Sequence, residues 1–222
     1  MRSLGSKYFS DLYNIDDISF LNITIEGPKN YWSFVSGLSD HSCKSLIISD
    51  KEGPLSLEGN AEVISDLFNL SFDDKKIDNL LQRKLVSIYE SSHKEEKLDH
   101  ISDSVYDLFK EISQDLNIGI TFREDLSIKD FIKILCPTIN VEYTSKLEMF
   151  VEYLKLINEI KSIDVFIFLN LKSIFTKEDL QAFSLECQYH KFHIINLEPY
   201  RTPFSIESEV AKVIDSDLCE IE

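Results

Sequence analysis

The chain has 222 residues, of which 43% are hydrophobic, and its formal net charge at pH 7 is −16. A chain of this length buries about 70% of its unfolded surface, which is enough for one substantial core with a smaller lobe. The negative charge excludes indiscriminate coating of nucleic acid, because that binding draws its affinity from Lys and Arg. It does not exclude a local channel that gathers some of the 23 basic residues.

No apolar run approaches the roughly 20 residues of a membrane span. Residues 1–7 have no apolar segment behind their charges that could act as a secretion signal. We therefore expect a cytoplasmic protein without a membrane partner. The four cysteines are widely separated and lie mostly in apolar patterns, which indicates reduced thiols rather than a disulfide framework.

The first part of the chain predicts an alternation of strands and helices. Ile18–Ile25 is rich in β-branched and aromatic residues and ends at a Gly-Pro turn. A short helix with one apolar face follows at 31–38, and Leu46–Asp50 predicts the next strand. Residues 1–72 therefore predict the first part of the sheet, with the strand at Leu46–Asp50 as one of its members.

From Asp73 the apolar residues fall at helical spacing, and no proline occurs before Pro137. Two long helices are predicted on either side of a polar turn at 91–97, and we expect them to fold back as an antiparallel hairpin. The second helix carries a heptad-like apolar seam, formed by Leu98, Ile101, Val105, Leu108 and Ile112. A third helix is expected after Ser127, with Asp130 in the reciprocal capping position.

The segment 164–204 carries the strongest pattern. Val165–Leu171 is almost continuously apolar, and a second apolar run lies at 193–197. The helix between them has Thr176 and Asp179 spaced as a capping box. A strand that is apolar on both faces needs helices on both sides, so this segment predicts a β-α-β unit of a parallel sheet.

These elements predict a discontinuous α/β domain of residues 1–72 and 146–222, with a helical insertion at 73–145. A helix at 145–162 returns the chain to the sheet. The last segment, 205–222, holds six acidic residues against one lysine, so we expect an acidic surface element or a partner-binding tail.

The phosphate loop of a nucleotide hydrolase is absent. Such a loop needs glycines that let backbone amides approach the phosphates, a Lys, and a Ser or Thr for magnesium. The turn at 25–31 has one glycine and a proline that lacks an amide. The buried strand that begins at Val165 is followed by Asn170 rather than by an acidic metal ligand. We therefore expect no nucleotide cofactor and no enzymatic activity.

Two groups of residues have the spacing of a metal site or a nucleophile. Cys187, His190 and His193 could form a soft-metal cluster, but no fourth ligand is near in sequence, which favours a buried thiol and a histidine at a helix end. His41 and Cys43 lack an orienting residue and an oxyanion loop.

Glu124 and Asp125 form an acidic loop whose oxygens suit a hard cation such as calcium. Two carboxylates before a helix also interact favourably with its dipole, which is the simpler interpretation.

Two pairs of basic residues could follow a phosphate backbone. Lys129 and Lys133 lie one turn apart on the predicted third helix, and Lys76 and Arg83 lie two turns apart on the first. Either pair could equally be a solvated helix face.

One arrangement resembles a known family. A strand that ends at Asn170, the link and helix start Phe175–Leu180, and a strand that ends at Leu197-Glu198 match a signature of the accessory adaptation protein of type II-A CRISPR systems. A weaker similarity covers Glu124–Leu135, where acidic residues precede a Lys-containing helix.

The resemblance implies a degenerate P-loop sheet domain, similar to the head of ABC-type ATPases, that has lost nucleotide hydrolysis. It also implies a homo-tetrameric ring that takes up double-stranded DNA ends in a lysine-lined channel, independently of base sequence, with calcium bound to acidic residues. Its expected partners are the CRISPR integrase complex and the effector nuclease of spacer acquisition.

Two alternatives stay open at this point. One is a protein-interaction subunit on an inactive ATPase-like scaffold without DNA binding. The other is a small metal-dependent hydrolase that uses Glu124, Asp125 and a histidine.

Overall fold

The computed structural model describes residues 2–39, 46–92, 94–123 and 125–221. It divides into two compact units. The first unit comprises Met1–Leu70 and Glu142–Glu222, and the second comprises Ser71–Val141. The chain is therefore α/β in class, with mixed sheets in the first unit and helices in the second.

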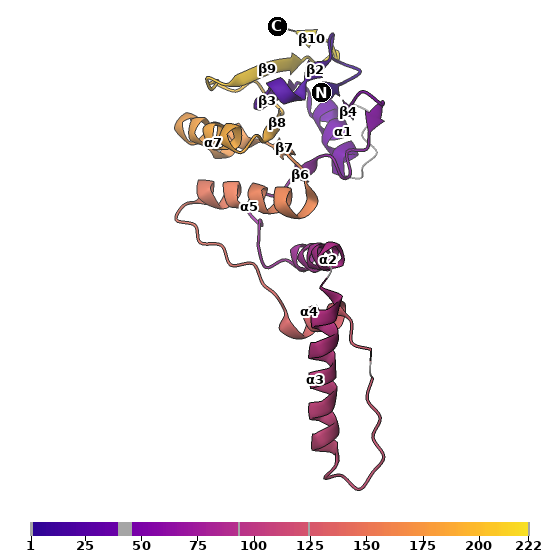
Figure 1. Ribbon diagram of the computed structural model, residues 1–222. Coiled ribbons are helices and arrows are strands. Elements are labelled where there is room, and N and C mark those ends of the chain that lie inside the picture. Colours follow the sequence, from indigo (N-terminus) through magenta and orange to yellow (C-terminus); the bar gives the residue numbers. More distant parts are fainter. Residues whose placement is uncertain (1, 40–45, 93, 124, 222) are drawn as a thin grey trace. The chain divides into compact units, whose positions relative to one another are not determined.

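The first unit is built on a six-stranded sheet in the order β10-β9-β3-β8-β7-β6 (Figure 1). Neighbouring strands run parallel, except that β10 is antiparallel to β9. The strands are β3 (Phe20–Ile25), β6 (Glu62–Ile64), β7 (Val165–Leu169), β8 (His193–Glu198), β9 (Glu209–Ile214) and β10 (Glu220–Ile221).

The β-α-β unit predicted from the sequence is confirmed. Strands β7 and β8 pair in parallel, with Phe166 opposite Ile194. The helix between them is α7 (Lys177–Tyr189), and Thr176 and Asp179 form its capping box. The one-turn helix α6 (Leu171–Ile174) lies between β7 and α7.

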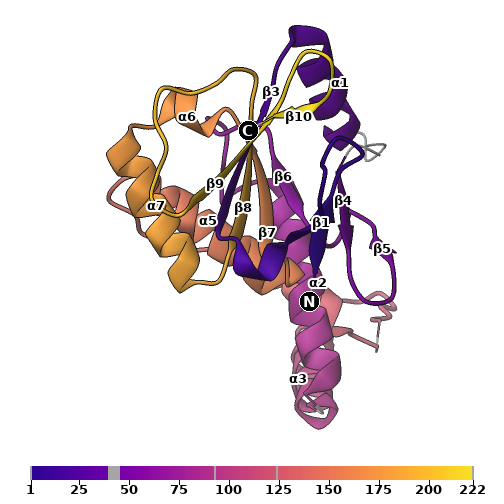
Figure 2. The same ribbon diagram turned by 90° about the horizontal axis from the view of Figure 1, so that it is seen from above.

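Helices cover both faces of this sheet, as Figure 2 shows, with α7 on one side and α1 (Pro28–Ser39) on the other. Alternate residues of each strand point to opposite faces. Phe168 meets Phe183 of α7 at 5.8 Å between ring centroids. Ile167 joins the core on the other face, together with Phe34 and Leu38 of α1. Helix α5 (Lys146–Lys161), which was predicted at 145–162, packs beside α7.

A second, antiparallel sheet lies beside α1 in the order β2-β1-β4-β5. Its strands are β1 (Ser3–Gly5), β2 (Tyr13–Asn14), β4 (Ile47–Ser49) and β5 (Pro54–Leu55), and the short helix η1 (Ile15–Asp17) follows β2. Leu46–Asp50 therefore contains a strand, but the prediction that it joins the main sheet is wrong. Ile48 is fully buried while Ile47 is 40% exposed, which suits a sheet with one solvated face.

The acidic segment 205–222 is an ordered edge of the main sheet rather than a free tail, and its Glu207 and Asp217 are exposed. Strand β9 pairs with β3 inside the main sheet, and β10 extends the sheet beyond it. Two acidic side chains of this segment are neutralised by lysines, because Glu209 lies 2.5 Å from Lys172 Nζ and Glu220 lies 2.8 Å from Lys212 Nζ.

Glu220 links β10 to the N-terminal segment. Its carboxylate accepts hydrogen bonds from the Tyr13 hydroxyl at 2.7 Å and from the backbone N–H of Ser10 at 2.6 Å, and it pairs with Lys212. Burial acts to raise the pKa of Glu220, but these hydrogen bonds lower it from the usual 4.5 to about 2. The ionised form is therefore favoured in the folded state.

We expect Glu220→Gln to lower the free energy of unfolding by about 1–2 kcal/mol at neutral pH, after allowance for solvent screening. Because the folded-state pKa is depressed, this contribution is present above about pH 4.5 and fades towards pH 2. Urea unfolding at about pH 7 and about pH 3 measures the difference between the variant and the unsubstituted protein. An equal difference at both pH values would contradict the assignment of the stabilisation to the ionised carboxylate.

The second unit consists of α2 (Lys75–Ser91), α3 (Glu95–Ser113) and α4 (Ile128–Leu135). The capping box predicted for the third helix is confirmed, because Ser127 and Asp130 bond reciprocally. The helix ends at Leu135, and the next residue, Cys136, has a left-handed φ of 44°.

The prediction of an antiparallel hairpin of α2 and α3 is wrong. Helix α2 packs against α4 instead. Three members of the predicted seam of α3, Ile101, Leu108 and Ile112, are 51%, 53% and 58% exposed. Phe122, in the segment that follows α3, packs on Tyr106. The heptad-like pattern is therefore real, but no other helix of the described chain covers it.

Across the described part of the chain, no helix is both long and apolar enough to cross a membrane.

Candidate functional site

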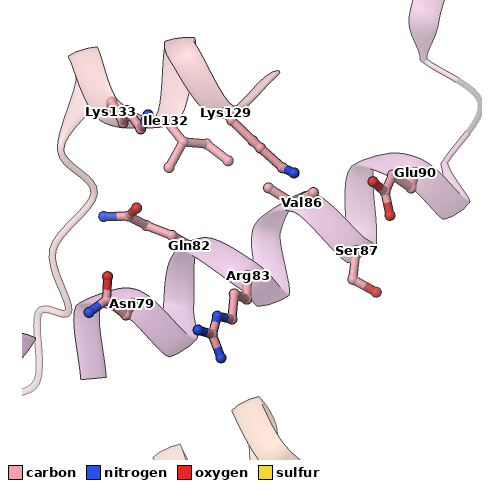
Figure 3. A pocket seen from close by; sticks show the side chains of 9 residues that line it. All are labelled: Asn79, Gln82, Arg83, Val86, Ser87, Glu90, Lys129, Ile132 and Lys133. Carbon is pink, nitrogen blue, oxygen red and sulfur yellow. The ribbon is translucent and has the colours of Figure 1, made fainter. Parts of the chain in front are cut away.

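A pocket of 410 Å³ lies between α2 and α4 in the second unit (Figure 3). Three of the four basic residues singled out from the sequence line it, namely Arg83, Lys129 and Lys133. The remaining lining side chains are polar, apolar or acidic, and they are Asn79, Gln82, Val86, Ser87, Glu90 and Ile132. The structure thus brings residues of both predicted basic pairs to one pocket.

The local structure of α4 explains this placement. The capping box at Ser127 fixes where the helix begins, so Lys129 and Lys133 lie one turn apart. Ile132 is 8% exposed and anchors α4 on α2. Figure 3 shows Gln82 projecting from α2 toward α4, and Lys129 extending from α4 toward α2. Arg83 leaves α2 on the side away from α4, so it stands at the edge of the pocket.

The three cations of the pocket have no carboxylate partner among the described residues. Among the described residues, neither Arg83 nor Lys129 nor Lys133 forms an ion pair within 4.0 Å. All three are exposed. Their charge is therefore available to an anion, which makes the pocket a candidate phosphate site.

Lys76 does not line this pocket. It lies in the first turn of α2, where its backbone N–H donates to Asp74 Oδ1 at 2.9 Å. The sequence-based pairing of Lys76 with Arg83 is therefore not reproduced in the site.

The acidic loop before α4 is only partly described, because Glu124 lies outside the described residues. Asp125 Oδ1 accepts a hydrogen bond from Arg123 Nε at 3.2 Å, and the same guanidinium lies 3.3 Å from Asp130. The Ser127 hydrogen bonds lower the pKa of Asp130, and the charges of Arg123 and Lys133 lower it further. The Arg123 guanidinium therefore pairs with both described carboxylates, Asp125 and Asp130.

No group of three or more His, Cys, Asp or Glu side chains suited to a metal ion occurs among the described residues. The ligand set that calcium prefers, six to eight oxygens, is therefore not assembled by the described residues of this loop. Calcium binding at Glu124 and Asp125 stays a prediction.

The other candidate metal ligands have partners of a different kind. Burial raises the pKa of the Cys187 thiol well above its usual value. His193 Nδ1 lies 2.9 Å from the carbonyl oxygen of Ile18, and His190 stacks on Phe192. His41 and Cys43 lie outside the described residues.

A buried polar network lies at the carboxyl ends of the parallel strands. Lys172, in α6, donates from Nζ to Glu209 Oε1 at 2.5 Å and to the carbonyl oxygen of Phe204 at 3.0 Å. The two paired side chains are 1% and 2% exposed. The backbone N–H of Lys172 donates to Glu198 Oε1 at 2.8 Å, and Asn196 Nδ2 donates to the same oxygen at 2.9 Å.

This network occupies the position where open α/β sheets usually hold a ligand. Burial raises the pKa of Glu198, against the hydrogen bonds that favour its ionised form. Burial and the charge of Glu198 raise the pKa of Tyr31 to about 12, and its hydroxyl donates to Asn170 Oδ1 at 2.8 Å. Among the described residues, no buried side-chain nitrogen or oxygen lacks a hydrogen-bond partner. The polar side chains at the carboxyl ends of the strands therefore form hydrogen bonds with one another.

The turn between β3 and α1, where a phosphate loop would lie, is also filled by protein groups. Asn30 Nδ2 donates to the carbonyl oxygens of Glu26 at 3.3 Å and Ser216 at 3.0 Å. Arg201 Nε donates to Glu26 Oε1 at 2.9 Å.

The family model described as CRISPR-associated protein (Cas_Csn2) matches residues 39–218. The chain belongs to this family. The match confirms the resemblance seen between Asn170 and Glu198, and it covers most of the chain, including the helices that carry the pocket. A CRISPR-associated role follows from it. No curated protein matches the sequence.

Sequence reasoning missed two features of this Cas_Csn2 protein. Gln82 could have been predicted to lie near the pocket, because it is the neighbour of Arg83 on the same helix. The Lys172–Glu209 pair could not be predicted from local sequence, because its partners are 37 residues apart in the chain.

Proposed function

We propose that this Cas_Csn2 protein binds the ends of double-stranded DNA, independently of base sequence, as a non-enzymatic accessory protein of spacer acquisition. The observation that carries the proposal is the pocket between α2 and α4, where three cations have no carboxylate ion-pair partner among the described residues. In a chain with a net charge of −16, such a local concentration of positive charge favours a phosphate ligand.

The first unit supports the non-enzymatic part of the proposal. Its parallel strands and flanking helices are compatible with a degenerate ATPase-like scaffold. In such a scaffold the nucleotide would lie at the carboxyl ends of the strands, where the protein has the buried pair of Lys172 and Glu209. The proposed scaffold thus keeps the sheet and has replaced the nucleotide site by internal hydrogen bonds.

The exposed seam of α3 supports assembly into a homo-tetrameric ring. Its apolar residues recur alternately three and four apart, which is the spacing that pairs helices in coiled coils. Ile101, Leu108 and Ile112 are each more than half exposed. We propose that a second copy of the chain covers them. In this proposal the ring acts with the CRISPR integrase complex and the effector nuclease, and calcium would bind at Asp125 only after release of Arg123.

A binding assay with linear and covalently closed circular duplexes of the same sequence tests the proposed function. At low salt we expect the linear duplex to bind and the closed circle to bind much more weakly, because only the former has ends. Lys129→Ala with Lys133→Ala is expected to weaken the linear complex while leaving the solution mass of the protein unchanged, because both side chains are exposed and neither has an ion-pair partner among the described residues.

If the protein binds neither duplex, with or without calcium, the proposed DNA binding is contradicted. The exposed apolar seam of α3 would then favour the second candidate, a protein-interaction subunit on an inactive ATPase-like scaffold.

A further inference from the structure

The pocket between α2 and α4 has the size and lining of a site for one small anionic group. Its 410 Å³ fall within the usual range of small-ligand pockets, about 300–1,000 Å³. Val86 and the buried Ile132 form an apolar wall, and the amide of Gln82 and the ammonium of Lys129 lie beside it (Figure 3). An apolar wall with a few polar groups is the arrangement that orients a bound small molecule.

We propose that this pocket receives the terminal phosphate of a DNA strand, with the terminal nucleotide against the apolar wall. The inference rests on the proposed binding of DNA ends and specifies the group that is recognised. A phosphomonoester carries about −1.5 to −2 charges at neutral pH, whereas each phosphodiester of the duplex carries one. Two ammonium groups one turn apart on α4 therefore gain more from a terminal phosphate than from an internal one.

The charges around the pocket favour the same ligand. Lys129 and Lys133 have no described ion-pair partner, so binding breaks no existing pair. Glu90 is the single carboxylate among the lining side chains, and Arg83 stands at the edge, where it can meet the next phosphate of the strand. The net charge of −16 disfavours long contacts with duplex DNA, so a local group of cations such as this pocket contributes more to binding.

The experiment uses the full chain and blunt linear duplexes of one sequence that carry a 5′-phosphate, a 3′-phosphate or only hydroxyl ends. We expect removal of the terminal phosphate to weaken binding by about tenfold, the size expected for a charge-assisted hydrogen bond. In Lys129→Gln with Lys133→Gln this difference should disappear. The matched control is Lys97→Gln with Lys110→Gln, which removes two exposed lysines of α3 from the same unit and should keep the difference.

The 5′ and 3′ duplexes identify which strand end supplies the phosphate, and a preference for either supports the proposal. Equal binding of phosphorylated and hydroxyl ends, with linear DNA still preferred to closed circles, would overturn this proposal and leave the proposed function intact. A phosphate preference that survives in Lys129→Gln with Lys133→Gln would overturn the assignment to this pocket. Thermal unfolding of each variant verifies that the fold is kept.

Discussion

Replacing Lys172 by Met is expected to lower the free energy of unfolding by about 3–5 kcal/mol, which is the usual effect of removing one partner of a buried ion pair. The side chain of Lys172 is 1% exposed, and its Nζ lies 2.5 Å from Glu209 Oε1. Methionine fills a similar volume but leaves the carboxylate of Glu209, 2% exposed, without its counter-charge. It also leaves the carbonyl oxygen of Phe204 without this donor. Urea unfolding measures the change.

Two further variants make this prediction specific. The double variant Lys172→Met with Glu209→Gln removes both charges, so it should recover a large part of the loss. Lys155→Met breaks the more exposed pair with Glu152, 2.6 Å apart, and should cost less than about 1 kcal/mol. A double variant as unstable as the sum of its two single variants would show that the charges of Lys172 and Glu209 are not coupled.

The buried pair of Lys172 and Glu209 lies at the edge of the first unit's sheet, at the carboxyl ends of its parallel strands. In an open α/β sheet the loops at the carboxyl ends of the strands usually close on a bound molecule. Here the ammonium of Lys172 reaches the backbone of Phe204 and the hydroxyl of Thr202, both in the segment between β8 and β9. An internal cation therefore holds this segment against α6.

The features that the sequence predicted correctly are local ones. The capping boxes at Thr176 and at Ser127 each join residues three positions apart, so the spacing alone identifies them. The continuous apolar run at Val165–Leu169 identifies a strand that is buried on both faces. Lys129 and Lys133 share a helix, and their proximity follows from the helical repeat.

The features that the sequence did not predict depend on distant partners. Glu209 lies in a segment of acidic composition, which does not predict a buried strand. The segment forms a strand because it pairs with β3, with Val210 opposite Leu21. Leu46–Asp50 has the composition of a strand, but nothing in it specifies the sheet that it joins. That Arg83 lines the same pocket as the lysines of α4 likewise depends on how α2 packs, which local spacing does not encode.

In the proposed homo-tetramer, replacing Ile101 and Leu108 by Ser is expected to release smaller species at micromolar concentration. Both residues lie on the seam of α3 and are about half exposed in the single chain. Burying a Leu or Ile fully contributes about 1.5–3 kcal/mol, so burying the exposed half contributes roughly 1 kcal/mol per side chain. Two helices that meet along the seam would lose four such contributions, roughly 4 kcal/mol or about a thousandfold in the dissociation constant.

The matched control changes two positions on the opposite side of the same helix, Asp103→Ser with Lys110→Ser. Both side chains are exposed, and together they leave the net charge unchanged. The solution mass of each variant is measured by light scattering over a range of concentrations. If the seam variant and the control keep the same mass as the unsubstituted protein, self-association does not use α3. A monomer for the seam variant alone would mean that the heptad-like spacing, which finds no helical partner within the described chain, serves contacts between copies.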